Sequence, residues 1–132
     1  MKDNRLSLRP SINTIDSTKN LSNFERFQNT TLRPIIKLQH DLIIELFIQY
    51  AQKRKTDLQA ITYKELKMFI ENTLTKDSVL KNQYIGMIVG HFTLNEYKDY
   101  TLMSAEIGKR TLQMIRQRLQ DTMLINVKKV TT

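Results

Sequence analysis

Two histidines, His40 and His91, are the side chains best suited to chemistry in this chain of 132 residues, because the chain has no cysteine. The lack of thiols excludes disulfides, thiolate metal sites, CxxC redox chemistry and a cysteine nucleophile. A transition-metal site would therefore need carboxylates. Neither histidine has a glutamate three residues before it, the spacing of di-iron helical bundles, because Lys37 and Ile88 stand there. We predict no metal site, no catalytic residue and no cofactor.

Each histidine has a structural interpretation and a functional one. In a helical projection His40 falls among apolar neighbours such as Ile36 and Ile44, so we expect an interior or interface histidine that forms hydrogen bonds. The functional alternative is a group that responds to pH or contacts a ligand. His91 follows Gly90 between two predicted helices, and this position favours a capping or surface role.

A basic and amide-rich face is predicted on the last helix, where six side chains share one arc over about three turns. These residues are Lys109, Arg110, Gln113, Arg116, Gln117 and Gln120. Such side chains can bond phosphates and base edges, so nucleic-acid binding is one hypothesis and a solvated helix face is the other. The formal net charge is +8. Its even spread along the chain argues against a dedicated nucleic-acid reader, which concentrates its charge.

Two glycines, Gly86 and Gly90, form a GxxxG pattern on one helical face. We expect a neighbouring helix to pack closely against Gly86, and Gly90 to end its helix in a left-handed conformation. No strand precedes these glycines, so they do not form a phosphate-cradling loop.

The elements that must position these residues are helices. Only three glycines and two prolines interrupt the chain, and capping boxes mark three helix starts, at Ser22, Thr62 and Thr93. We predict helices at about 23–30, 33–54, 63–74, 77–89 and 94–123. The fold class is therefore all-α, a bundle of about five helices of which two are long. The predicted boundaries are an extended or mobile arm at 1–21, one helical domain at 22–126 and a tail at 127–132.

Both predicted long helices carry apolar side chains on two sides, whereas a surface helix of a monomeric bundle needs only one apolar stripe. Pairing two copies across a two-fold axis would cover the second stripe. We therefore expect a homodimer, and its interface would include Tyr100, Met103, Ile107 and Met114.

Two segments resemble a family of small helical proteins from Bacteroidota. They are residues 27–39, FQNTTLRPIIKLQ, and residues 86–93, GMIVGHFT, and the resemblance covers residues 22 to about 120. It implies a bacterial helical protein, and members are often labelled glyoxalase, which implies a metal-dependent lyase. Glyoxalase-type sites use histidine, glutamine and glutamate on strand-rich modules, so no catalytic residue is carried over to this helical chain.

Three functions stay open. The favoured one is a helical interaction module that self-associates or binds another protein, without enzymatic activity. The alternatives are a nucleic-acid-binding accessory protein and the metal-dependent lyase that the label implies. Charged residues interrupt the longest apolar stretch, 35–51, and residues 1–10 contain no signal-like apolar region, so we expect no membrane association and a cytoplasmic location.

Overall fold

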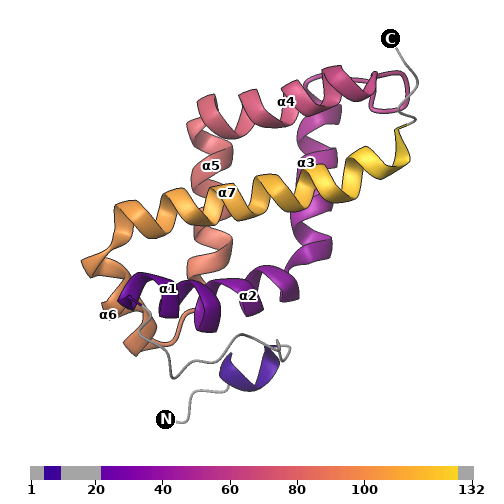
Figure 1. Ribbon diagram of the computed structural model, residues 1–132. Coiled ribbons are helices and arrows are strands. Elements are labelled where there is room, and N and C mark those ends of the chain that lie inside the picture. The colour runs from indigo at the N-terminus through magenta and orange to yellow at the C-terminus, as the bar shows by residue number, and fades with distance from the viewer. Residues whose placement is uncertain (1–4, 10–21, 128–132) are drawn as a thin grey trace.

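The fold is all-α, as predicted. The computed structural model describes residues 5–9 and 22–127, and within these ranges the chain forms helices and no strand (Figure 1). The α-helices are α1 (Asn23–Phe27), α2 (Arg33–Leu38), α3 (His40–Lys53), α4 (Tyr63–Lys76), α5 (Ser78–Val89), α6 (Leu94–Leu102) and α7 (Ser104–Met123). A π-helical turn (Gln28–Leu32) joins α1 to α2, and short 3-10 helices lie at Arg5–Leu8 and Leu124–Asn126.

Helix α7 is the centre of the arrangement. It crosses α3 and α5 and packs along α4, and in Figure 1 it lies between α4 on one side and α1–α2 on the other. The side chains that it shares with these helices form one hydrophobic core. This core includes Phe27, Leu32, Ile35, Ile36, Ile43, Phe47, Leu66, Ile70, Tyr84, Ile88, Ile107, Ile115 and Leu119. Because the core holds one side of α7, the opposite side must face solvent.

The predicted helix starts are confirmed at atomic detail. Thr62 and Thr93 each form a complete capping box, in which the hydroxyl accepts from the backbone N–H three residues on and that residue's glutamate accepts from the cap's own N–H. Ser22 also caps α1, but the Glu25 carboxylate accepts from the Ser22 hydroxyl at 3.1 Å. These local signals explain why the starts could be predicted.

The prediction of a single helix over 33–54 is wrong. The chain is helical from α1 through α2, bends at Gln39 (φ −93°, ψ 11°) and continues as α3. Pro34 therefore lies inside a helical run, where a proline lacks an N–H and its ring crowds the preceding turn. The wider π-helical turn just before α2 gives that ring room.

The prediction of a single helix over 94–123 is also wrong, because Met103 (φ −137°, ψ 28°) separates α6 from α7. Residues on the two sides of this break do not share a helical projection. The two parallel apolar stripes expected on a single helix over 94–123 are therefore not present. Ile107, assigned to the outer stripe, is only 1% exposed within the single chain.

The glycines have other roles than those predicted. Gly90 ends α5 in the right-handed region (φ −59°, ψ −17°), so the left-handed stop is wrong. Gly86 is exposed, and a methyl group added there would meet no atom within 4 Å, so no helix packs closely against it. The close approach is instead at the buried Gly108 of α7, where such a methyl would lie 3.6 Å from Cδ1 of Ile85.

Candidate nucleic-acid interface

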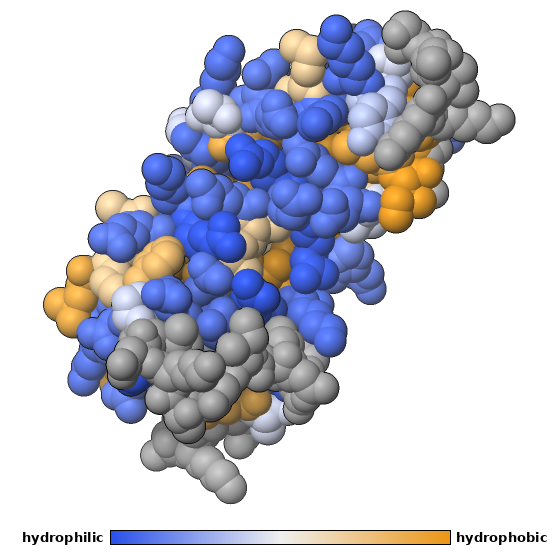
Figure 2. Space-filling view, viewed as in Figure 1, coloured by the Kyte–Doolittle hydropathy of each residue, from blue (hydrophilic) through white to orange (hydrophobic). Residues whose placement is uncertain are grey.

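A groove of about 690 Å³ runs between α2 and α7 and is strongly basic. Arg33 and Lys37 line it from α2, and Arg110, Arg116 and Arg118 line it from α7. Its single carboxylate is that of Asp121, which leaves a net charge of +4 among its lining residues. Figure 2 shows the hydrophilic band that crosses the middle of this face, over α7.

The structure brings together four of the six residues of the predicted basic face. Arg110, Gln113, Arg116 and Gln117 line the groove. The other two lie outside it: Lys109 is exposed on α7, and Gln120 turns toward α4, where it donates to Glu71 at 3.3 Å.

Sequence reasoning missed the cations that complete the groove. Arg33 and Lys37 are four residues apart on α2, so they share a helix face. Nothing local indicates that this face lies beside α7. Arg118 was missed because, at 100° per residue, it projects outside the arc of the predicted basic face, yet it lines the groove.

Hydrogen bonds hold several of the groove side chains in place without neutralising them. The Arg110 guanidinium donates to the side-chain oxygens of Gln28 at 2.7 Å and Gln113 at 3.2 Å. The Gln117 amide donates to Asp121 at 2.8 Å. Among the described residues, none of the five cations of the groove forms an ion pair. Their charge is therefore available to an anion from solution.

His40 lies half-buried at the start of α3, beside the groove. Its Nδ1 is 3.2 Å from a terminal nitrogen of Arg118. An arginine can only donate, so the bond requires Nδ1 to be the unprotonated ring nitrogen. The predicted hydrogen-bonded histidine is thus present, and it positions a cation of the groove.

The four residues of the predicted dimer interface are not exposed together. Ile107 belongs to the core, and Met114 lines the basic groove. Tyr100 and Met103 are half-buried against the core, and the Tyr100 ring lies 5.6 Å from that of Phe92. A stripe made of all four is therefore wrong, because the chain covers most of it.

Three exposed apolar side chains lie on α6, which buries no residue. Leu94, Tyr97 and Leu102 of this helix are 68%, 47% and 83% exposed. Hydrophobic side chains gather at the left end of the face in Figure 2, where α6 meets α7.

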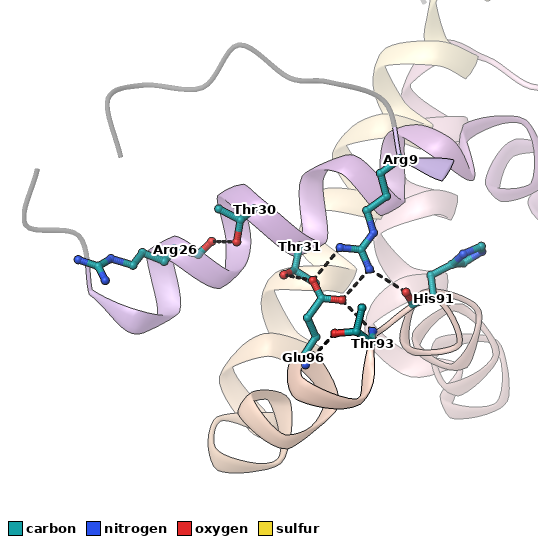
Figure 3. Close-up of polar contacts among 7 residues, drawn as sticks. All are labelled: Arg9, Arg26, Thr30, Thr31, His91, Thr93 and Glu96. Carbon is teal, nitrogen blue, oxygen red and sulfur yellow. Dashed lines mark hydrogen bonds and ion pairs between the residues drawn. The ribbon is translucent and has the colours of Figure 1, made fainter. Parts of the chain in front are cut away.

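A second polar cluster joins the N-terminal segment, residues 5–9, to α6 (Figure 3). The Arg9 guanidinium donates to both oxygens of Glu96, at 2.7 and 2.6 Å, and to the backbone carbonyl of His91 at 2.7 Å. The Glu96 carboxylate also accepts from the Thr31 hydroxyl at 2.8 Å and from the Thr93 N–H at 2.9 Å. Burial would raise the pKa of Glu96, but the bonds from Arg9, Thr93 and Thr31 outweigh it and hold that pKa below the ordinary range.

This cluster changes the description of the predicted arm. Residues 5–8 form a 3-10 helix and Arg9 is docked, whereas the rest of residues 1–21 lies outside the described residues. The ring of His91 contacts Gln39 at the bend between α2 and α3, its Nε2 meeting the Gln39 side-chain nitrogen. Burial, and then the charges of Arg9 and Arg5, lower the pKa of this histidine.

Comparisons with known proteins add no relative: no family model, no curated protein and no solved structure matches this chain. Kinship with the Bacteroidota family stays a prediction. Among the described residues, no three histidine or carboxylate side chains lie close enough together to hold a metal ion. Of the helices described, none combines the length and apolar character needed to cross a membrane.

Proposed function

We propose that the protein binds nucleic acid through the groove between α2 and α7. The observation that carries this proposal is the convergence of five cationic side chains from two helices on one groove, without a protein carboxylate paired to any of them among the described residues. Uncompensated cations in a concave site attract a polyanion, and the phosphate backbone supplies one negative charge after another along its length.

The side chains of the groove suit this partner chemically. Four of the five cations are arginines, whose planar guanidinium can donate two parallel hydrogen bonds to one phosphate. Gln113 and Gln117 stand between them, and their amides can bond phosphates, sugars or base edges. Contacts mainly to phosphate give affinity with little sequence preference, which fits an accessory protein. A cytoplasmic location is part of the same proposal.

The salt dependence of binding tests the proposal. A fluorescent random-sequence duplex, and a single strand of the same sequence, are titrated with the protein at two salt concentrations. If all five cations contact phosphates of the duplex, the slope of log K against log salt is about −4.5, and a fourfold rise in salt weakens binding by roughly 500-fold. Failure to bind either the duplex or the single strand at low salt contradicts the proposal.

Two double variants that remove the same charge test whether binding depends on the groove or on the net charge of the protein. Arg33→Gln with Arg116→Gln removes one cation from each wall, and we expect the slope to fall in magnitude by about 1.8. Lys64→Gln with Lys67→Gln removes the same charge from the exposed surface of α4 and should leave the slope nearly unchanged. Equal losses in the two double variants would mean that binding follows net charge, not this groove.

Self-association is the second candidate function, and the exposed apolar face of α6 favours it. Leu94, Tyr97 and Leu102 present apolar area that a second copy, or another helical protein, could cover. Light scattering of the wild type should then give the mass of a dimer, and Leu102→Glu should give monomers. Val79→Glu, at a 77% exposed position on α5, is the control and should not change the mass. A monomeric wild type at micromolar concentration contradicts this second proposal.

A further inference from the structure

A cleft larger than the basic groove lies where α3, α4 and the end of α7 meet. It measures about 960 Å³ and is bounded by α3, the loop 54–62, the start of α4 and the residues that end and follow α7. Figure 1 shows these elements at one end of the molecule, and Figure 2 shows hydrophobic side chains at the same end. We call this the apolar cleft, and its apolar lining includes Ile44, Ile48, Leu58, Ile61, Met123 and Val127.

The walls of the apolar cleft keep apolar surface open to a ligand. Ile44 and Ile48 of α3, Leu58 and Ile61 of the loop, and Val127 after α7 are all half-buried. Each therefore covers the core with one side and presents apolar area to the cleft with the other. Concave sites of roughly 300–1,000 Å³ with apolar walls and a few polar groups are typical of small-molecule binding.

One end of the apolar cleft adjoins two nitrogen-bearing side chains. On α3, His40 lies one turn before Ile44, and on α7, Arg118 lies one turn before Thr122, which lines both the apolar cleft and the basic groove. His40 and Arg118 meet each other, with Nδ1 of the ring 3.2 Å from a terminal guanidinium nitrogen. Because Nδ1 accepts this bond, Nε2 of the neutral ring carries the proton and can donate. Two helices thus place hydrogen-bond donors at this end.

The two ends of the apolar cleft differ in charge. Arg118 forms no ion pair among the described residues, and the nearby Asp121 carboxylate accepts from Gln117 instead. The one charged residue of the described cleft lining is Asp57, in the loop beyond the other end of α3, where its carboxylate accepts from the Gln59 N–H at 2.9 Å. A negatively charged group is therefore favoured at the Arg118 end and disfavoured at the Asp57 end.

We propose that the apolar cleft binds the aliphatic chain of a fatty-acid-like carboxylate, and that Arg118 and His40 bind the carboxylate group. The planar guanidinium of an arginine can donate two parallel hydrogen bonds to one carboxylate. Between His40 and Gln52, whose side chain also lines the cleft, α3 rises about 18 Å, which leaves room for an extended chain. The proposal goes beyond nucleic-acid binding and does not rest on it, although both would use Arg118.

Other occupants could cover the same apolar walls, and the test must separate them. A neutral apolar molecule would fill the cleft without using Arg118 or His40. An apolar segment of a second copy would fill it in the absence of any added ligand. Decanoate and decanol are a suitable pair of probes, because they share one chain length and differ in the charged group.

Nuclear magnetic resonance on the full chain locates the bound probe. We expect decanoate to shift the methyl signals of Ile44, Ile48 and Ile61 to saturation. Val79 on α5 and Leu102 on α6, which are 77% and 83% exposed, are the controls and should not shift. Equal shifts at the controls would mean adsorption to exposed apolar groups and would overturn the proposal. No shift at the cleft, or cleft signals that change on dilution without decanoate, would overturn it as well.

The strength of binding tests the two halves of the ligand. Affinity should rise about two- to fourfold for each methylene group added from octanoate to decanoate, as the cleft buries more of the chain. Arg118→Gln should weaken decanoate binding about tenfold, because a hydrogen bond to a charged group is lost, and should leave decanol binding unchanged.

A matched variant controls for net charge. Lys98→Gln removes the same charge from an exposed position on α6 and should leave the binding of both probes unchanged. Equal weakening by Arg118→Gln and Lys98→Gln would show that decanoate follows net charge. Wild-type protein that binds decanol as tightly as decanoate would show that no carboxylate site exists. Either result overturns the proposal.

Discussion

Replacing Ile107 by alanine should destabilise the folded monomer, although the sequence pattern assigns this residue to a dimer interface. The side chain is 1% exposed and belongs to the core beneath α7. Truncating a buried isoleucine to alanine costs about 2–5 kcal/mol, from lost burial and from the cavity that remains. A cost of about 3 kcal/mol is a large part of the 5–15 kcal/mol that holds a typical domain together.

Thermal and urea unfolding measure this loss. For a domain of this size, about 3 kcal/mol should lower Tm by roughly 10–20 °C, and Ile107→Val should cost only about 0.5–1.5 kcal/mol. Met114→Ala is the control, because Met114 is half-buried at the groove and should cost less. The m-value should not change and the loss should not depend on protein concentration. A loss that shrinks on dilution would refute the reasoning, because it would show that Ile107 stabilises an association of chains.

Two further predictions concern a helix interior and an ionisable pair. Gly86→Ala should stabilise the protein by about 0.5–1 kcal/mol in urea unfolding, because the added methyl meets open space and alanine favours the helix; destabilisation would mean that a helix does pack there. Tyr50→Phe should raise the pKa of Asp77 toward its usual 3.8, because the 2.6 Å bond from the Tyr50 hydroxyl is the largest cause of the lowered value. The wild-type contribution of Asp77 to stability is complete above pH 3.8 and is lost as pH falls through its folded pKa; a titration of the Asp77 carboxylate that is the same in both proteins would contradict this assignment.

The helix starts could be read from the sequence because their causes are local. Thr62 and Thr93 need only a glutamate three residues on, and both capping boxes form as written in the chain. The helix breaks at Gln39 and Met103 could not be predicted from the sequence. Neither Gln39 nor Met103 is a residue that ends helices by itself. Gln39 contacts His91 from another part of the chain, and Met103 packs on the core, so tertiary contacts accompany both bends.

The candidate sites depend on pairs of segments that only the folded chain brings together. The α7 half of the groove was predicted because helical periodicity places Arg110 and Arg116 on its wet side. The α2 half was not, since no periodicity relates Arg33 to residues more than 70 positions later. The Arg9–Glu96 pair joins residues 87 positions apart, and in the sequence Glu96 shows only its capping role.

The groove and the Arg9–Glu96 cluster share one structural element, yet the contacts keep them separate. Thr31 lies on the helical run that carries Arg33 and Lys37, and its hydroxyl ties that run to Glu96. This bond does not pass through Arg9, so loss of the Arg9 side chain would leave α2 tied to α6 and the cations of α2 beside α7. The core holds α2 independently, through residues such as Ile35 and Ile36. Replacing Arg9 therefore should not remove the groove, and the Arg9→Gln protein should bind nucleic acid with the wild-type salt dependence.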